Sequence, residues 1–291
     1  MKSYKKLTFS LIRYSLLPGV CLLTEMAWSS PTKEKGILLV HYGTTNEIRR
    51  ESTLDVFNHE VAEKFADCKV IEAYTSSAVR KALARQGITK LSVTEGLDSL
   101  KRLGCQEVVV QTSLLLEGVM MNGVQHDVEK TKSQFRDIQL AHSLLYSLDD
   151  CRRMVSCLDR ELQQREGGSV RQVVLVGHGS DTPSNAIYCQ IDYLMKDEGR
   201  PTWHVGTIEG YPTIEQVKKG LILSDVRQVV IIPLLYIAGN HLYEDIDGEW
   251  RKELEQEGYQ VSVWHTGLGE LAETRRMLIQ NINEMLTKYE H

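Results

Sequence analysis

The chain has 291 residues and a formal net charge of −5, with 42% hydrophobic and 25% charged residues. This composition is ordinary for a globular protein, and the length allows one large domain or two of moderate size. No Lys/Arg-rich run occurs beyond the first residues, which argues against a nucleic-acid-binding protein, so we expect no nucleic-acid partner.

The first 30 residues differ in composition from the rest. Three lysines among the first six residues precede a mostly apolar segment at residues 7–28, and small and polar residues follow it. This order is typical of a secretory signal peptide, although Arg13 and Glu25 interrupt the apolar part. We therefore predict a signal peptide over residues 1–30 and an exported protein that is not integral to the membrane once this leader is removed. A cytoplasmic protein is the alternative.

Six cysteines occur, and they lie at positions 21, 68, 105, 151, 157 and 189. Five remain after removal of the predicted leader, and none forms a CxxC motif. We therefore expect neither a disulfide framework nor a cysteine-based zinc site, but free buried thiols. Lipidation at Cys21 is a weaker alternative, because Val20 stands where a lipobox has a small residue.

From Lys35 onward, apolar runs of strand length alternate with stretches of helix length. Parallel strands joined by right-handed crossovers are the expected pairing for this alternation. In the first half the predicted strands cover residues 36–43, 69–74, 107–112 and 139–142, and the predicted helices cover residues 47–65, 77–86, 92–103, 119–134 and 149–164. In the second half the predicted strands cover residues 173–178, 204–209, 228–235 and 260–265, and the predicted helices cover residues 183–195, 213–223, 241–256 and 270–288.

These elements predict an α/β fold of two Rossmann-like domains, each a parallel sheet of about four strands flanked by helices, with a cleft between them. The predicted bounds are residues 35–165 for the N-terminal domain and 170–291 for the C-terminal domain. The polar segment at residues 163–168 is the predicted linker. One continuous doubly wound sheet is the alternative.

Three polar residues fall at or just beyond the predicted carboxyl ends of neighbouring strands in the second half: His178, Glu209 and His241. Ligands bind at this edge of open α/β sheets, and adjacent glycines let the backbone approach closely. Two imidazoles and a carboxylate suit a divalent first-row metal, and the same groups can move protons near neutral pH. Taken singly, each residue has another explanation, as a turn residue or a helix cap.

The two halves align with one another, which predicts an internal repeat. Residues 37–44, 71–74, 117–120 and 140–142 align with residues 173–180, 208–211, 238–241 and 263–265 respectively. In this alignment only the carboxylate recurs in the first half, so the predicted chemistry is confined to the second half. The residues placed opposite one another are Tyr42 and His178, Glu72 and Glu209, and Met120 and His241.

Several motifs resemble those of the anaerobic cobaltochelatases of the CbiK type. They are VGHGS at 176–180, IEGYP at 208–212, PLLYIAGNH at 233–241 and GLGE at 267–270, with YGTT at 42–45 and AYTS at 73–76 in the first half. The resemblance covers nearly everything from Lys35 onward. It implies the chelatase-like fold of the class II chelatases, single-chain enzymes related to ferrochelatase. It also implies ATP-independent insertion of Co²⁺ into sirohydrochlorin on the oxygen-independent route to cobalamin.

The resemblance implies that His178, Glu209 and His241 bind the metal and that His178 is also the proton acceptor. It implies sirohydrochlorin and a divalent metal as partners, and no tightly bound cofactor beyond the substrate metal Co²⁺. Fe²⁺ is the alternative metal, haem is an alternative ligand, and a homo-oligomer is left open.

An exported copy resembles the periplasmic variants of this family, so we expect a periplasmic location. The alternative function is a periplasmic metal- or haem-binding transport protein that uses the same cleft without catalysis. His41 departs from the family pattern, where a smaller or apolar residue is expected, and it predicts a different cleft floor or an additional ligand.

Basic residues are candidates for binding the acidic side chains of the tetrapyrrole, since guanidinium groups pair well with carboxylates. The predicted substrate-binding residues are Tyr42, Arg80 and Lys81. Arg49, Arg50 and Arg85 are weaker candidates, because ordinary solvated helix faces also explain them.

Overall fold

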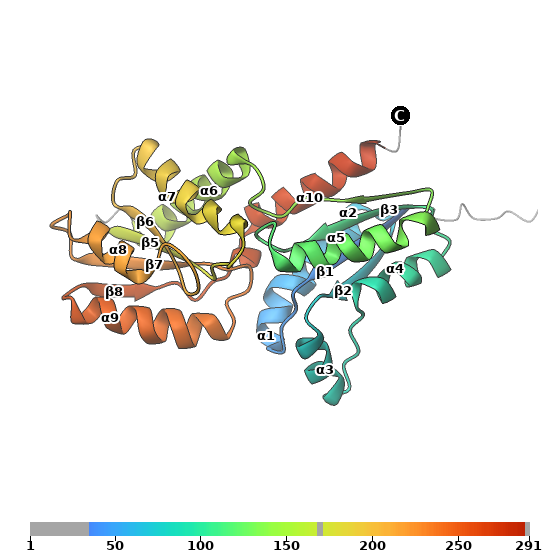
Figure 1. The fold of residues 1–291 in the computed structure, drawn as a ribbon, viewed down its shortest axis with the longest axis horizontal. Coiled ribbons are helices and arrows are strands. Elements are labelled where there is room, and N and C mark those ends of the chain that lie inside the picture. Colours follow the sequence, from blue (N-terminus) through green and yellow to red (C-terminus); the bar gives the residue numbers. More distant parts are fainter. Residues whose placement is uncertain (1–34, 168–170, 289–291) are drawn as a thin grey trace, which may run out of the picture. The chain divides into compact units, whose positions relative to one another are not determined.

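A computed structural model describes residues 35–167 and 171–288 of the chain (Figure 1). The predicted signal peptide at residues 1–30 and part of the predicted linker lie outside the described residues. Within the described residues, no helix is both long enough and apolar enough to cross a membrane.

The described chain contains two parallel four-stranded sheets, as predicted. Their strands are near-continuous apolar runs, which is typical of parallel strands covered by helices on both faces. The first sheet has the order β2-β1-β3-β4 and the second the order β6-β5-β7-β8. The strands are β1 Lys35–His41, β2 Lys69–Tyr74, β3 Glu107–Thr112, β4 Asp137–Leu140, β5 Gln172–Gly177, β6 Trp203–Thr207, β7 Gln228–Leu234 and β8 Gln260–Val263.

Helices connect the strands at the predicted places, and several begin at side-chain caps that the sequence supplies. Ser92, Ser147 and Thr213 each form a capping box with the residue three positions later, which satisfies free backbone N–H groups of the first turn. The helices of the first half are α1 Glu47–Arg50, η1 Glu51–Asp55, α2 Val56–Lys64, α3 Ser77–Arg85, α4 Val93–Arg102, α5 Val119–Thr131, η2 Lys132–Gln134 and α6 Leu148–Glu166. Those of the second half are η3 Pro183–Asn185, α7 Ala186–Asp197, α8 Ile214–Leu221, η4 Leu242–Trp250, α9 Arg251–Gln256, η5 Leu268–Glu270 and α10 Ala272–Thr287.

Two of the predicted long helices contain π-helical segments. The helix predicted over residues 47–65 passes through η1, and the helix predicted over 241–256 begins with η4. Segments of π-helix inside α-helices are rare and are frequent at functional sites. The segment η4 follows His241 directly.

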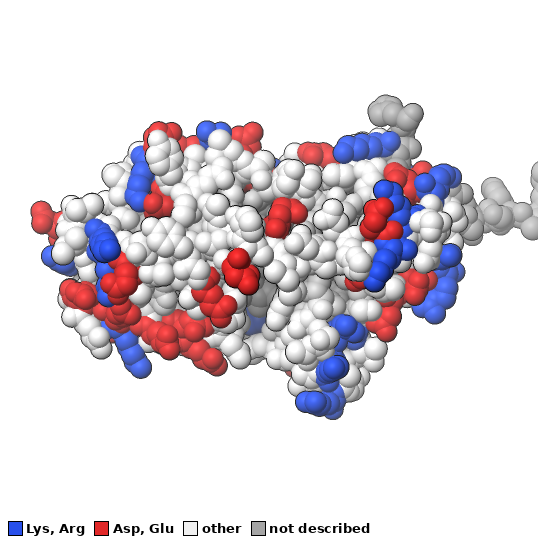
Figure 2. Space-filling view, in the orientation of Figure 1, with Lys and Arg blue, Asp and Glu red and all other residues white. Residues whose placement is uncertain are grey.

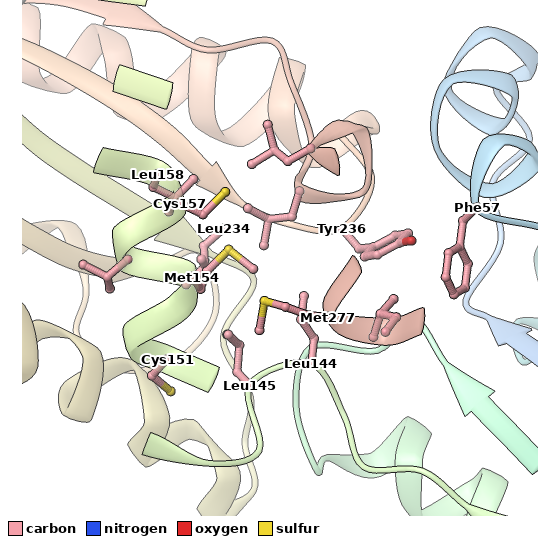
Figure 3. Packing of buried hydrophobic residues seen from close by; sticks show 14 of the residues in the cluster. Phe57, Leu144, Leu145, Cys151, Met154, Cys157, Leu158, Leu234, Tyr236 and Met277 are labelled. Carbon is pink, nitrogen blue, oxygen red and sulfur yellow. The ribbon is translucent and has the colours of Figure 1, made fainter. Parts of the chain in front are cut away.

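Each half contributes a helix to the surroundings of the other half. Helix α6 packs against α7, whereas α10, the last helix, packs against β3 of the first sheet (Figure 1). One apolar cluster consequently contains residues of both halves, from Met154 and Leu158 on α6 through Tyr236 to Phe57 on α2 (Figure 3). The predicted bounds of the two domains stay a prediction.

Strand register supports the internal repeat at the third strand of each half. Leu39 of β1 lies opposite Gln111 of β3, and Leu175 of β5 lies opposite Ile232 of β7. Met120 follows Gln111 by the same number of residues as His241 follows Ile232. Met120 is therefore equivalent to His241, as the alignment predicted.

At the second strand of each half the predicted alignment is wrong. Leu39 lies opposite Glu72, while its counterpart Leu175 lies opposite Val205. Glu72 is therefore the counterpart of Val205 inside the strand, not of Glu209, which comes four residues later. The side chain of Glu72 contacts Lys90 and accepts a hydrogen bond from Asn58, so it is part of a structural network.

Candidate functional site

His178 lies immediately beyond the carboxyl end of β5, between two glycines that the backbone requires. Gly179 has a φ of +92°, and a Cβ there would lie 1.3 Å from the carbonyl oxygen of Glu209. A Cβ on Gly177 would lie 2.2 Å from Cε1 of Tyr188. The N–H of Glu209 also donates to the carbonyl oxygen of His178 at 2.7 Å. The Gly-His-Gly motif thus allows the segments after β5 and β6 to approach each other closely.

The structure brings His178 and His241 together. Their ring centroids lie 4.6 Å apart, with the planes at 87°. His178 follows β5 and His241 precedes η4, so the two imidazoles reach this point from different elements at the same edge of the sheet. This pairing was predicted from their positions at neighbouring strand ends.

Asp245 holds the His241 ring from the side opposite the one a metal would use. Nδ1 of His241 lies 2.7 Å from Oδ2 of Asp245. A carboxylate accepts, so Nδ1 carries the proton and Nε2 has a free lone pair, which is the usual arrangement of a metal-binding histidine. Sequence reasoning missed Asp245, although its spacing of four residues from His241 within one helix was a usable signal.

Glu209 lies two residues beyond β6, and it is exposed. In the described residues, no group of three or more His, Cys, Asp or Glu side chains is arranged to hold a metal ion. The structure therefore brings the two histidines together without placing the Glu209 carboxylate in a complete ligand set. Metal binding by Glu209, and by the trio as a whole, stays a prediction.

A cavity of about 490 Å³ lies next to His178 and is lined by residues of both halves. Its first-half wall is largely apolar, because Leu114, Leu115 and Leu116 follow β3 and Val119 and Met120 begin α5. The second-half wall carries the polar groups. The second-half residues that line the cavity are His178, Gly179, Ser180, Asp181, Tyr188, Glu209, Gly210, Leu234, Leu235 and Tyr236.

Hydroxyl groups form a chain in the loop that follows His178, and Ser180, the first of them, lines the cavity. Oγ of Ser180 lies 2.7 Å from Oγ1 of Thr182, which lies 2.7 Å from Oγ of Ser184. The N–H of Ser180 donates to Oδ1 of Asn185 at 2.9 Å, which fixes the loop that follows His178. These residues were not predicted, apart from the quoted VGHGS motif that contains Ser180.

The predicted substrate-binding residues lie outside the lining of this cavity, as far as the described residues show. Tyr42 is half-exposed directly after β1. Arg80 lies on α3 with Nη1 3.9 Å from Oε2 of Glu95, and Lys81 is exposed on the same helix. Their contact with substrate stays a prediction.

Two weaker candidates, Arg49 and Arg50, face carboxylates of the protein itself. Arg50 is buried, with Nη2 and Nε each 3.6 Å from a carboxylate oxygen, of Glu47 and Asp55 respectively. Nη1 of Arg49 lies 3.2 Å from Oε1 of Glu270.

His41 does not supply the additional ligand that its departure from the family pattern predicted. Its side chain is fully buried, with Nδ1 2.8 Å from Oγ of Ser113 and Nε2 3.0 Å from Oδ1 of Asn58. Burial lowers its pKa, because the charged imidazolium loses its hydration. Both ring nitrogens are engaged inside the protein, so His41 is a structural residue.

Negative charge surrounds His241 on the helix that it precedes. Acidic residues make up four of the nine positions of η4, at Glu244, Asp245, Asp247 and Glu249. Acidic side chains also gather where α9 continues this helix, at the lower edge of the view in Figure 2. Such a field raises the local concentration of divalent cations near the histidines.

Comparison with known proteins gives one family. The model of the cobalt chelatase (CbiK) family matches residues 35–287. The chain is 26% identical over 258 residues to the sirohydrochlorin cobaltochelatase of Salmonella typhimurium, covering 87% of this chain and 97% of the relative. It is 30% identical over 234 residues to the sirohydrochlorin cobaltochelatase CbiKC of Nitratidesulfovibrio vulgaris, covering 78% of this chain and 82% of the relative.

Solved structures show the same fold at lower sequence identity. SirB from Bacillus subtilis with Fe³⁺ superposes with a TM-score of 0.67 at 14% identity, covering 88% of this chain and 97% of that one. The sirohydrochlorin chelatase SirB from Bacillus subtilis subspecies spizizenii in complex with cobalt gives a TM-score of 0.64 at 15% identity, with the same coverage. The predicted chelatase-like fold is confirmed. Because the family model matches residues 35–287, which are most of this chain, the chain belongs to the cobalt chelatase (CbiK) family.

Proposed function

We propose that the protein is a sirohydrochlorin cobaltochelatase, which inserts Co²⁺ into the tetrapyrrole without ATP. One observation carries the proposal: the paired imidazoles of His178 and His241 beside a cavity with an apolar wall, in a chain of the CbiK family. Curated relatives with this activity align over most of their own length.

The chemistry requires a metal ligand and a proton acceptor at the same place. Insertion forms bonds from Co²⁺ to the pyrrole nitrogens and releases two N–H protons, so the product and two protons leave. His241 binds the incoming ion through Nε2, since Asp245 holds its Nδ1. His178 lines the cavity and accepts a pyrrole proton, which a neutral imidazole does well near neutral pH.

The cavity walls divide the remaining tasks. The leucines at residues 114–116 together with Val119 and Met120 give an apolar surface for one face of the macrocycle. The carboxylate of Glu209 on the opposite wall adds negative charge for the metal. Holding the macrocycle and the ion in this geometry converts an encounter of two solutes into a reaction within one complex.

The test is metal insertion by the purified protein, followed by the absorbance of the tetrapyrrole with sirohydrochlorin and Co²⁺ and without ATP. We expect turnover, and a loss of roughly 100-fold or more in His178→Ala, because a positioned base contributes at least that much. His59→Ala is the control, since this histidine is exposed on α2 and pairs with Glu63. Unchanged turnover in His178→Ala would contradict its role, and a bound macrocycle that stays metal-free would support a binding protein without catalysis.

We propose Co²⁺ as the physiological metal, with Fe²⁺ as the alternative. A mixed imidazole and carboxylate set accepts several divalent first-row ions, so the donor types alone do not select one. Competition between Co²⁺ and Fe²⁺ for limiting sirohydrochlorin, under anaerobic conditions, measures the preference as a ratio of kcat/KM. A ratio in favour of Fe²⁺ would contradict the assignment of cobalt.

We also propose that the protein acts in the periplasm. The support is the order of basic, apolar and small residues over positions 1–30. N-terminal sequencing of the mature protein, combined with cell fractionation, tests this. Recovery of the whole chain with an intact N-terminus in the cytoplasmic fraction would contradict export.

A further inference from the structure

Arg49 of the first half contacts three groups around the helix that follows His241. Its Nη2 donates to the hydroxyl oxygen of Tyr243 at 2.6 Å. Its Nη1 donates to the carbonyl oxygen of His265 at 3.0 Å and to Oε1 of Glu270 at 3.2 Å. The Arg49 side chain is only 14% exposed, so these contacts hold the guanidinium in one place.

Two of these partners also hold each other and the helix η4. The ring of Tyr243 stacks on that of His265, with centroids 5.9 Å apart and planes at 29°. Nε2 of His265 lies 2.9 Å from Oδ2 of Asp247, a second residue of η4. Helix η4 is therefore held at Tyr243 and at Asp247. Arg49 donates to the hydroxyl of Tyr243 and to the backbone carbonyl of His265, whose side chain contacts Asp247.

The position of His241 depends on this helix. His178 directly follows a buried strand, whereas His241 precedes η4 and its side chain is 48% exposed. Tyr243 lies only two residues further along the chain. Two imidazoles bind one ion only if their nitrogens meet it within a fraction of an ångström, so a small shift of η4 weakens the site.

We propose that Arg49 is a positioning residue for metal binding: through Tyr243 and His265 it fixes η4 and hence the place of His241 relative to His178. This proposal rests on the proposed function of the same site. It assigns to an arginine of the first half an effect on metal affinity in the second half. It also replaces the expectation that Arg49 binds substrate carboxylates, because the guanidinium already donates to three groups of the protein.

Arg275 provides a matched comparison. It too joins the halves, with Nε 3.0 Å from both carboxylate oxygens of Glu60 and Nη1 3.0 Å from the carbonyl oxygens of Gly269 and Glu270. None of these partners belongs to η4, within the part of the chain that the structure describes. An arginine that only stabilises the fold should therefore behave like Arg275, and a positioning arginine should not.

The experiment measures equilibrium binding of Co²⁺ alone to the full chain, together with KM for Co²⁺, KM for sirohydrochlorin and the thermal midpoint. Tyr243→Phe removes only the hydroxyl that Arg49 binds, and we expect it to weaken Co²⁺ binding severalfold. For Arg49→Gln we expect about a 10-fold loss, in the range found when outer hydrogen-bond partners of metal ligands are removed. Arg49→Lys keeps the charge opposite Glu270 and should recover part of the affinity.

The combined variant Arg49→Gln/Tyr243→Phe should bind Co²⁺ no more weakly than Arg49→Gln, because both changes break the same contact. Arg275→Gln should lower the thermal midpoint and leave Co²⁺ affinity unchanged. Equal Co²⁺ affinity in wild type, Arg49→Gln and Tyr243→Phe would overturn the proposal, as would an equal loss in Arg275→Gln.

The two proposals fail in different ways. A wild-type chain that binds Co²⁺ but leaves sirohydrochlorin metal-free contradicts the proposed function, and the affinities of the variants still decide the role of Arg49. A wild-type chain that binds no Co²⁺ overturns both.

Discussion

His241 and Asp245 face each other at the start of helix η4, with Nδ1 of the imidazole 2.7 Å from Oδ2 of the carboxylate. The pair selects the tautomer in which Nε2 has the free lone pair, and it fixes the plane of the ring. The spacing of four residues within one helix is what allows the contact. The metal-binding role that we propose for His241 therefore depends on a residue that need not touch the metal.

The first prediction is that Asp245→Asn weakens Co²⁺ binding by about 10-fold or more, because the amide no longer fixes the tautomer and orientation of His241. Equilibrium Co²⁺ titration of the purified variant measures the effect. Glu249→Gln is the control, since it removes one negative charge from an exposed position of the same helix. If both variants lose affinity equally, the effect comes from the general field of the helix and not from the hydrogen bond.

The second prediction concerns the glycine after His178. Gly179→Ala should abolish metal insertion and lower the thermal midpoint by several degrees, because a Cβ would collide with the Glu209 carbonyl at a φ of +92°. The collision separates the segments that carry His178 and Glu209. Gly239→Ala is the matched control, since a Cβ there meets nothing within 4 Å. Activity retained in Gly179→Ala would show that these two segments need not be so close.

The third prediction is a dependence of stability on pH that arises from His204. Burial lowers its pKa to about 4, and the nearby charge of Lys196 acts in the same direction. Between pH 6.5 and 4 the unfolded chain binds a proton at this residue that the folded chain does not. The free energy of unfolding is therefore highest above about pH 6.5. It falls as the pH falls, by up to about 3 kcal/mol at pH 4.

Denaturant unfolding of wild type and His204→Gln across pH 4 to 7 isolates this effect as the difference in slope. His41, whose pKa burial also lowers, acts in both proteins and cancels in the difference. His59→Gln is the control, because the side chain of His59 is 73% exposed. Parallel curves for wild type and His204→Gln would contradict the assignment.

Much of the architecture follows from sequence pattern, since parallel strands buried on both faces appear as unbroken apolar runs. The residues at strand ends could be predicted for the same reason, because neighbouring parallel strands end at one edge of the sheet. This is why His178 and His241 could be paired before their distance was known. The order of strands and helices along the chain was sufficient to predict that these two histidines lie close together.

Other features depend on contacts that a local pattern does not encode. The predicted match of Glu72 with Glu209 is wrong because the similar sequences around these two residues lie four residues out of register with each other. The register is decided by strand pairing, which the sequence alone does not show. The packing of α10 on the first sheet depends on tertiary contact, since its apolar residues are compatible with either half. The interaction of Arg49 with Tyr243 joins residues 194 positions apart.

The fourth prediction concerns the apolar wall of the cavity. Met120 is 42% exposed there and occupies the position equivalent to His241 in the first half. Met120→Ala should raise KM for sirohydrochlorin about fivefold, which corresponds to roughly 1 kcal/mol of lost apolar contact, and leave Co²⁺ affinity unchanged. Leu223→Ala is the control, because Leu223 is 87% exposed beyond α8 and does not line the cavity. Steady-state kinetics with each substrate varied in turn separates the two constants. A change confined to Co²⁺ affinity would place Met120 with the metal ligands, and not with the wall that holds the macrocycle.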